Sequence, residues 1–392
     1  MDRSNDIVIP AKTGFLNDPE AQRVCRVITD AGYDVYFVGG CVRDAVLGKP
    51  DSDVDISTNA LPEQVMSLAE AAGLKAVPTG IDHGTVTVIA GKDAFEVTTF
   101  RRDVATDGRR AVVAFSDNIA DDARRRDFTM NALYSDPSGR IIDPLGGLTD
   151  LLARKVRFIE DANARIQEDY LRILRFFRFS AWYSNQLTGF DPDALAAIAA
   201  NTGGLETLSA ERVGQEMTKL LSAPNPAPAI AAMRQTGVLS AILPGSDDQW
   251  LSIVVHLEQH LRLDADWVAR LAALGGQDAA ARLRLSKANA RKLELLRDIG
   301  FSGPPLPEIA YRHGADIAGQ ALLLRAAMAE DTPEIALLET IKRASQAVFP
   351  IRAADLMPTF EGPALGARLD LLEREWIASG FTLSGVQLLD LP

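Results

Sequence analysis

The chain is 392 residues long, 47% of its residues are hydrophobic and 24% are charged, and its formal net charge at pH 7 is −12. This length predicts two or more domains, and the composition is typical of a globular protein. The acidic balance argues against broad nucleic-acid binding through global charge, but it leaves room for a local basic groove. No apolar stretch is long enough to cross a bilayer, so we expect no transmembrane helix and no membrane partner.

Two further features bear on location. Residues 1–15 lack a basic region followed by an apolar stretch, so no secretory signal is expected. Cys25 and Cys41 cannot build a disulfide framework, and neither stands in a Cys-x-x-Cys pattern. A reducing, cytoplasmic environment fits such a chain.

The first 150 residues alternate between helix and strand patterns. Helices that end at a glycine are predicted at residues 18–31, 41–48 and 61–73. Runs of apolar and β-branched residues predict strands at residues 34–38, 52–58, 85–91 and 94–100. These elements describe a small mixed α/β sheet domain.

From Leu151 onward the strand patterns fade, and Ala/Leu/Arg-rich helical patterns take over. Three prolines within residues 222–229 break helix and mark a domain edge there. The predicted organisation is a sheet-bearing domain at residues 1–150, a helical segment at 151–222 and a second helical part at 223–392. The predicted fold class is therefore α+β.

Asp53 and Asp55 flank Val54 in a predicted strand. Side chains alternate along a strand, so both carboxylates point to one face, about 5–7 Å apart. Two carboxylates this close repel each other unless a cation lies between them, and Mg²⁺ prefers oxygen ligands. A lone Asp-x-Asp pattern is more often a solvated strand end, so the neighbouring residues decide between the two interpretations.

The residues just before this pair favour a site. Gly39 and Gly40 follow a predicted strand, and without a Cβ their backbone N–H groups can approach a phosphate closely. Arg43 adds a permanently charged guanidinium on the following short helix. A glycine turn, an arginine and paired carboxylates in one short stretch describe a site for a metal-bound nucleoside triphosphate.

The stretch VGGCVRDAVLGKPDSDVDIST (residues 38–58) resembles the signature of the polymerase-β-like nucleotidyltransferase superfamily. Within this superfamily, the stretch is similar in sequence to class II tRNA nucleotidyltransferases and bacterial poly(A) polymerases. The resemblance implies that two metal ions activate an RNA 3′-hydroxyl and hold the triphosphate. A third acid often completes the metal site, and Glu96 on a neighbouring predicted strand is our candidate, with an edge-facing structural role as the alternative.

RRRDFTMNAL (residues 124–133) is a second match to this family. On its own it predicts the start of a helix with Asp127 as the N-cap. The resemblance implies instead that Arg126 and Asp127 contact the sugar and phosphates of the nucleotide. Residues 143–159 resemble the family's hinge, whose glycines permit rotation.

EDYLRILRFFRF (residues 168–179) is the third match, and it predicts how the base is chosen. If Asp169 and Arg172 share one helix, they lie about 60° apart on adjacent turns. A carboxylate beside a guanidinium can bind the amino group and ring nitrogen of adenine or cytosine, whereas guanine and uracil would leave both side chains unpaired. An ordinary helix ion pair is the other interpretation of this spacing.

The same segment resembles the templating motif of class II nucleotidyltransferases. The resemblance implies that Asp169 and Arg172 select the base. It also implies that the triphosphate and sugar are held by Gly40, Arg43, Arg126, Arg175 and Arg178. Residues 211–221 resemble the family's last motif, a helix that supports the templating segment, so Glu211 and Arg212 are expected to be structural.

Three other patterns give weaker predictions of function. His256 and His260 stand four residues apart on a predicted helix, without an identifiable third ligand for zinc. The basic stretch at residues 282–298 is either a solvated helix face or a contact to an RNA backbone. Residues 100–111 resemble a flexible loop that helps the family switch between nucleotides.

The residues and the resemblance together predict a polymerase-β-like head followed by an all-α neck, body and tail. They predict a Mg²⁺-dependent, template-independent RNA nucleotidyltransferase that adds C, C and A to tRNA 3′ ends from CTP and ATP, with no DNA partner. An enzyme that adds A alone, to tRNA or as poly(A), is the nearer alternative. A non-catalytic RNA-binding module on the same scaffold is the more distant one.

Overall fold

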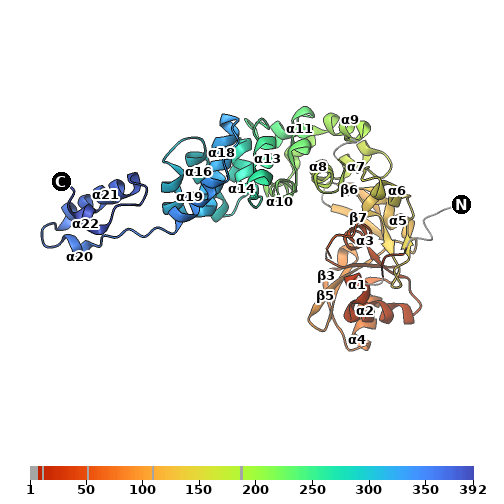
Figure 1. Cartoon of the computed structure of the whole chain (residues 1–392). Helices are drawn as coiled ribbons and strands as arrows, with labels where there is room; N and C mark the ends of the chain where they lie inside the picture. Colours follow the sequence, from red (N-terminus) through yellow and green to blue (C-terminus); the bar gives the residue numbers. More distant parts are fainter. Residues whose placement is uncertain (1–7, 11–12, 51–52, 108–109, 186–188) are drawn as a thin grey trace. The chain divides into compact units, whose positions relative to one another are not determined.

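The computed structural model describes residues 8–10, 13–50, 53–107, 110–185 and 189–392 (Figure 1). Ser52 of the predicted strand, residues 108–109 of the predicted loop and residues 1–7 of the N-terminal segment lie outside the described residues. The chain divides into two compact units, Met1–Ala223 with Gln235–Ile242, and Pro224–Arg234 with Leu243–Pro392.

A mixed sheet lies at the centre of the first unit. Within the described residues it has seven strands in the order β3-β4-β5-β2-β1-β8-β9. The strands are β1 (Val35–Val38), β2 (Asp55–Thr58), β3 (Lys75–Gly80), β4 (Thr85–Ala90), β5 (Asp93–Thr99), β8 (Tyr134–Ser135) and β9 (Ile141–Ile142). β2 and β5 run parallel, and the other neighbouring strands run antiparallel. The small mixed sheet expected from the sequence is confirmed.

Short helices surround this sheet. They are α1 (Gly14–Asn17), α2 (Pro19–Asp30), α3 (Gly40–Val46), α4 (Pro62–Ala71) and the 3₁₀ turn η2 (Ile81–His83). α2 begins where the Asp18 carboxylate accepts a hydrogen bond from the N–H of Glu20 at 2.9 Å. It buries Val24, Cys25 and Ile28, whose spacing is that of one helix face.

Residues 100–111, expected to form a flexible loop, instead lie mostly in a two-stranded antiparallel ribbon. β6 (Arg101–Asp107) pairs with β7 (Arg110–Phe115). The sequence signal for this hairpin is the Asp-Gly pair at positions 107–108 between two runs that contain β-branched residues. The charged composition of the stretch concealed that signal.

The rest of the first unit is helical. Its elements are α5 (Ile119–Arg124), η3 (Thr129–Asn131), α6 (Gly147–Leu152), α7 (Ala162–Glu168), α8 (Leu171–Tyr183), α9 (Pro192–Ala200), η4 (Thr202–Thr207), α10 (Ala210–Leu221) and α12 (Val238–Ile242). The helix expected after Asp127 is only the short turn η3. The expected domain limit at residue 150 falls inside α6. The three domain limits expected from the sequence stay predictions.

An aromatic cluster fixes α8 against the segment that contains η3. Phe158 stacks on Phe176 with ring centroids 5.5 Å apart, and Phe128 lies 5.2 Å from Phe179. All four rings are buried. Because aromatic pairs add to the free energy of burial, this cluster holds the arginine-bearing helix α8 in a defined place beside the sheet.

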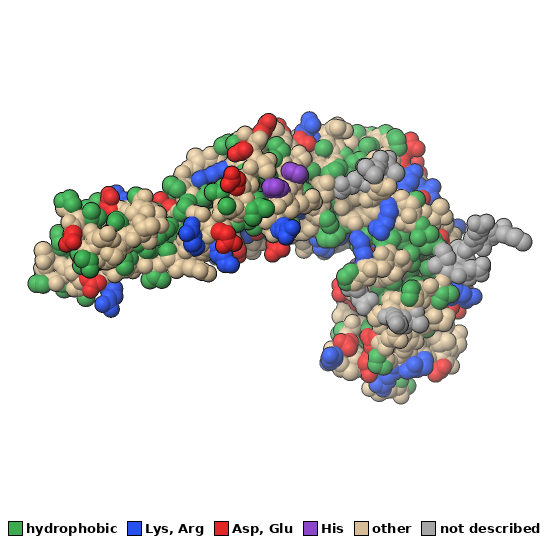
Figure 2. Space-filling view, in the orientation of Figure 1, with side chains coloured by type: hydrophobic (Ala, Val, Ile, Leu, Met, Phe, Trp, Pro, Cys, Tyr) green, Lys and Arg blue, Asp and Glu red, His purple; other side chains and the backbone are tan. Residues whose placement is uncertain are grey.

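The second unit is built from helices among the described residues. They are α11 (Ala227–Gln235), α13 (Leu251–Leu261), α14 (Trp267–Leu274), α15 (Ala279–Arg282), α16 (Lys287–Phe301), α17 (Leu306–His313), α18 (Ala315–Ala329), α19 (Ala336–Ser345), α20 (Ala353–Leu356), α21 (Gly362–Ala378) and α22 (Gly385–Leu389). The last helices share a small core that includes Leu372, Trp376 and Leu388. On the face drawn in Figure 2, basic and acidic side chains of this unit are interspersed. None of the described helices has the length and apolarity that a membrane span requires.

Candidate active site

The predicted carboxylates come together where β2 and β5 run side by side. Asp55 is the register partner of Glu96, and Asp53 precedes Asp55 by two residues. Paired residues of adjacent strands point to the same face, and neighbouring strands lie about 4.8 Å apart. Partial burial raises the pKa of Asp55 above its ordinary value, Arg126 lowers it, and Glu96 and Asp53 raise it further. Asp55 therefore interacts electrostatically with Arg126, Glu96 and Asp53.

The donor chemistry of this cluster suits a hard divalent cation. Mg²⁺ is usually held by one or two carboxylates together with waters and substrate phosphates rather than by a cage of protein ligands. Among the described residues, no three or more His, Cys, Asp or Glu side chains are grouped so that they could hold a metal ion by themselves. Asp53 and Asp55 fit such a site, and Glu96 as a third ligand stays a prediction.

Gly39 lets Arg126 approach this cluster. Its φ of +73° and ψ of −118° are a backbone conformation that L side chains rarely adopt. A Cβ built on Gly39 would lie 3.3 Å from Nη1 of Arg126. The Gly39 N–H donates to the carbonyl of Leu133 at 3.0 Å, so this N–H is engaged within the protein. Gly40 begins α3 and stays a predicted phosphate contact.

Arg43, expected to hold the triphosphate, is buried within the protein. Its Nε and Nη2 bind the carboxylate of Asp44 at 3.0 and 2.9 Å, and its Nη1 donates to Asn131 at 2.7 Å. Nη2 also donates to the hydroxyl of Tyr183 at 2.8 Å. In this arrangement Arg43 joins α3 to the end of α8, and it does not present a free guanidinium to a ligand.

Arg126 is oriented by two residues that the sequence analysis did not identify. Its Nη2 donates to the carboxylate of Asp122 at 3.1 Å, and its Nε donates to the hydroxyl of Tyr134 at 3.2 Å. Tyr134 donates to the same carboxylate at 2.7 Å. Burial alone would raise the pKa of Asp122, but the charges of Arg126 and Arg125 outweigh burial and lower this pKa to about 2. A buried anion thus holds Arg126 in one direction, with its Nη1 beside Gly39.

Asp127 joins the segment after α5 to α8. Its Oδ2 accepts from Nε of Arg175 at 2.7 Å, and its Oδ1 accepts from the N–H of Phe128 and from Asn131, both at 2.9 Å. Burial raises the pKa of Asp127, but Arg175 is the main cause that lowers it to about 2. Asp127 is therefore a buried structural anion here, and a direct contact to the nucleotide stays a prediction.

Asp169 and Arg172 do not share one helix, which corrects the geometry expected from the sequence. α7 ends at Glu168, α8 begins at Leu171, and Asp169 between them has an extended backbone. The carboxylate of Asp169 accepts from Nη2 of Arg212 at 2.7 Å. The helical spacing argument failed because the chain changes direction at Asp169. The two side chains still lie three residues apart at one helix start.

Arg172 is held by its own partners. Its Nη1 lies 2.5 Å from the carboxylate of Glu168 and donates to the carbonyl of Arg165 at 2.7 Å. Its Nη2 donates to the carbonyl of Arg125 at 3.2 Å. The selecting segment is therefore bonded to the backbone next to Arg126, and base choice by Asp169 and Arg172 stays a prediction.

Arg175 and Arg178 lie one turn apart on α8 and share the buried carboxylate of Glu216 on α10. Nε of Arg178 lies 2.7 Å from Glu216 and Nη1 of Arg175 lies 4.0 Å from it. Both guanidinium groups also lie over the ring of Phe179, at 5.3 and 4.6 Å from its centroid. Glu216 offsets the repulsion between the two arginines, and their phosphate contacts stay predictions.

One glycine of the expected hinge, Gly147, serves close packing. A Cβ on Gly147 would lie 2.0 Å from the carbonyl oxygen of Thr129, so only glycine lets α6 lie against η3. The N–H groups of Gly147 and Leu148 donate to the carboxylate of Asp143 at 2.8 and 2.9 Å. A rotation at this place stays a prediction.

The missed residues differ in how strongly the sequence marked them. Asp122 precedes Arg125 and Arg126 by three and four residues, which is the spacing of ion pairs on a helix, so the sequence contained a signal for it. Tyr134 and Glu216 are brought to the site by the tertiary fold, and no local pattern marks them. The paired histidines, His256 and His260, belong to no metal-binding group among the described residues.

The sheet with its central acidic cluster and the arginine-rich helix behind it define a polymerase-β-like nucleotidyltransferase. Residues 35–157 match the family described as "Poly A polymerase head domain", and residues 189–249 match "Probable RNA and SrmB- binding site of polymerase A". The structure is similar to that of the Bacillus stearothermophilus CCA-adding enzyme in complex with CTP, with a TM-score of 0.71 and 31% identity over 92% of each chain.

Curated relatives agree with this match. The CCA-adding enzyme of Streptococcus pneumoniae serotype 19F is 34% identical over 82% of this chain and 82% of its own length. That of Geobacillus thermodenitrificans is 42% identical over 59% of this chain, a match that spans only 56% of the relative. The chain belongs to the family of class II tRNA nucleotidyltransferases and bacterial poly(A) polymerases, a family that generally uses divalent metal ions.

Proposed function

We propose that this protein is a template-independent RNA nucleotidyltransferase that adds C, C and A to the 3′ ends of tRNA, with CTP and ATP as substrates. The observation that carries the proposal is the cluster of Asp53, Asp55 and Glu96 at the β2–β5 pair, with Arg126 beside it. Acidic side chains next to a fixed guanidinium suit a triphosphate and its metal ions. The relative with bound CTP, at 31% identity, supports CTP as one substrate.

The carboxylates of Asp53 and Asp55 would hold Mg²⁺. When bound there, the metal supplies positive charge that neutralises the phosphates and favours the deprotonated 3′-hydroxyl of the RNA. Arg126 would bind phosphate or sugar oxygens through Nη1, because Asp122 and Tyr134 already occupy its other nitrogens. Arg175 and Arg178 would add positive charge from α8.

Asp169 and Arg172 would choose the base. Arg212 and Glu168 fix the two side chains in place, and a side chain that is already fixed loses little entropy when a base binds. The Asp169 carboxylate would accept from the amino group of cytosine or adenine, while a guanidinium N–H of Arg172 would donate to the neighbouring ring nitrogen. Guanine and uracil would leave both groups unpaired, so GTP and UTP would be rejected.

A second candidate is the addition of A alone, either the terminal A of tRNA or a poly(A) tail. The match of residues 35–157 to the head domain of poly(A) polymerases supports this second candidate. The metal and phosphate contacts would be the same in both enzymes, so only the product distinguishes them.

The test uses tRNA transcripts that end before, within and after CCA, with each nucleoside triphosphate supplied separately. CTP should extend the shortest transcript by two nucleotides, ATP should then add one, and GTP and UTP should add none. Long A tails on unrelated RNA would instead assign poly(A) synthesis. Omission of Mg²⁺ should stop every addition.

We also infer a cytoplasmic location. The two described cysteines, Cys25 and Cys41, are buried thiols without a disulfide, as is usual for proteins of a reducing compartment. Fractionation of the source cells, with the protein expected beside tRNA in the soluble fraction, tests this.

A further inference from the structure

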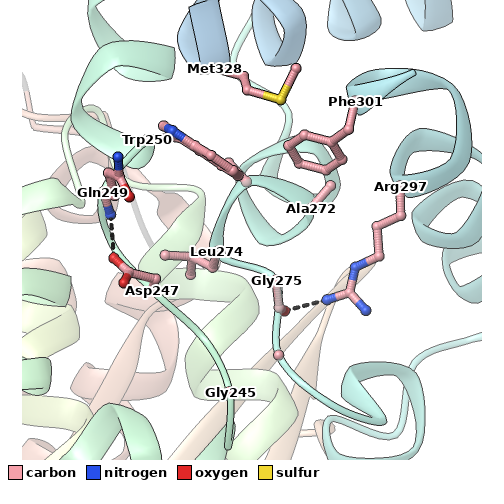
Figure 3. A pocket seen from close by; sticks show the side chains of 12 residues that line it. Gly245, Asp247, Gln249, Trp250, Ala272, Leu274, Gly275, Arg297, Phe301 and Met328 are labelled. Atoms are coloured by element: carbon pink, nitrogen blue, oxygen red, sulfur yellow. Dashed lines mark hydrogen bonds between the residues drawn. The ribbon is translucent and has the colours of Figure 1, made fainter. Parts of the chain in front are cut away.

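The second unit contains a cavity of about 530 Å³ that the nucleotidyltransferase site does not use (Figure 3). We name it the Trp250 cavity, after the tryptophan at the start of α13. Residues 245–249 and 272–276 form one side of it, and the hydrogen bond from the Asp247 N–H to the carbonyl of Leu274 at 2.9 Å ties these two segments together. Its volume is in the range of pockets that hold small organic groups.

Aromatic and apolar side chains form the opposite wall. The rings of Trp250 and Phe301 lie 5.3 Å apart, and Met328 on α18 points toward them with 43% of its surface exposed. Such a wall offers flat π faces and a polarisable sulfur, which favour contact with another planar ring. An exposed methionine beside two partly exposed aromatic rings is unusual unless something covers them.

A guanidinium group stands at the rim of this wall. Arg297 on α16 donates from Nη2 to the carbonyl of Gly275, and its buried Nε has no hydrogen-bond partner in the structure. Burial lowers the pKa of Arg297. Figure 3 shows Asp247 on the other side of the opening, held against Gln249. A cation in this position would be complemented by an anion that enters the cavity.

We infer that the Trp250 cavity binds one unstacked nucleotide of the RNA substrate, whose base packs on Trp250 and whose phosphate pairs with Arg297. This combination of an aromatic wall and a guanidinium whose Nε has no partner among the described residues fits a planar ring joined to an anion, and Asp247 can accept from a base amino group. The match described as a probable RNA-binding site ends at residue 249, next to Trp250. The inference rests on the proposed function only in that the protein must bind RNA.

The test measures the dissociation constant of the full chain for a labelled tRNA transcript at several salt concentrations. Trp250→Ala should raise the dissociation constant about tenfold at every salt concentration, and Trp250→Phe should largely restore it, because one stacked base contributes about that much. Arg297→Gln should reduce the slope of log affinity against log salt by about 1, and Arg297→Lys should restore it.

Arg325→Gln is the matched control. Arg325 is also a partly buried arginine of lowered pKa, but it donates to the carbonyls of Ile299 and Ser302 and does not line the cavity. It should change thermal stability without changing the salt slope. Ultraviolet cross-linking of a transcript that contains 5-iodouridine should mark Trp250 or Phe301, and this result does not depend on the stability of a variant.

The inference is overturned if the Trp250 and Arg297 variants keep the wild-type affinity and salt slope and no cross-link forms. The cavity would then be assigned to binding of a protein segment. That result would not affect the proposed function, because incorporation of CTP and ATP is measured separately. Conversely, a protein that adds no nucleotide but binds RNA in a Trp250-dependent manner would refute the proposed function and keep this inference.

Discussion

Arg175 on α8 holds a single carboxylate oxygen of Asp127 with two of its nitrogens, Nε at 2.7 Å and Nη2 at 2.5 Å. Asp127 directly follows Arg126, whose Nη1 lies next to Gly39 and the acidic cluster. The ion pair therefore fixes the position of Arg126 relative to α8, the helix that carries Arg172. Charge and geometry in this site are set by buried pairs of this kind.

Asp127→Asn should destabilise the fold by about 1.5–3 kcal/mol, because a buried hydrogen-bonded charge pair would lose its anion. The measurement is the free energy of unfolding in urea. Asp117→Asn is the matched control, since Asp117 is exposed and should lose less than about 0.5 kcal/mol. An equal, small effect of both substitutions would show that the Arg175 pair contributes little.

Asp122 gives a prediction for pH. Its pKa in the folded protein is about 2, below the ordinary 3.8, so its charge stabilises the fold above about pH 4 and that stabilisation is lost as the pH falls toward 2. Wild type should exceed Asp122→Asn by roughly 2 kcal/mol in unfolding free energy at pH 6, with the gap closing between pH 4 and 2. A gap that stays constant over this range would contradict the pairing of Asp122 with Arg125 and Arg126.

Gly39→Ala should reduce both stability and activity. The strained backbone should cost about 1–3 kcal/mol, and the new methyl group should displace Nη1 of Arg126. Gly48→Ala is the control, because Gly48 also has a positive φ of +63° but no atom within 4 Å of a new Cβ. Gly48→Ala should lose about 1 kcal/mol of stability with unchanged kcat/KM. Equal activity losses in both variants would show that the loss in Gly39→Ala is not caused by displacement of Arg126.

Arg172→Ala should blur base choice. The ratio of kcat/KM for CTP to that for UTP should fall about tenfold or more, since a missing hydrogen bond to the base costs at least about 1.4 kcal/mol. Arg157→Ala, which removes a half-exposed arginine whose side chain pairs with Asp150, should leave the ratio unchanged. Wild-type selectivity in Arg172→Ala would assign this side chain to structure alone.

Much of the fold could be predicted from the sequence, because α2, β1, β2, β4 and β5 follow local hydrophobic periodicity. The edge strand β3 was missed because Pro78 interrupts its pattern, and a proline is tolerated only where a strand has no second neighbour. The ribbon β6–β7 was missed because its charged residues resemble those of a loop.

Individual side chains of the site were placed less well than the segments that carry them. The pattern Asp-x-Asp was expected to place both carboxylates on one strand, but β2 begins at Asp55, so only the second carboxylate lies in the strand. The roles of Arg43 and Asp169 depend on Tyr183 and Arg212, which lie far away in the sequence. A local pattern cannot show that a charged group already has a partner elsewhere in the fold.

The most direct measurement of the central claim is single-nucleotide incorporation by wild type and Asp55→Asn on the same tRNA transcript with CTP and Mg²⁺. Asp264→Asn, an exposed substitution in the second unit, serves as the control, and circular dichroism verifies that all three proteins fold. We predict that Asp55→Asn loses at least about a thousandfold in rate while the control keeps wild-type activity. Wild-type incorporation by Asp55→Asn would contradict the assignment of this acidic cluster as the catalytic site.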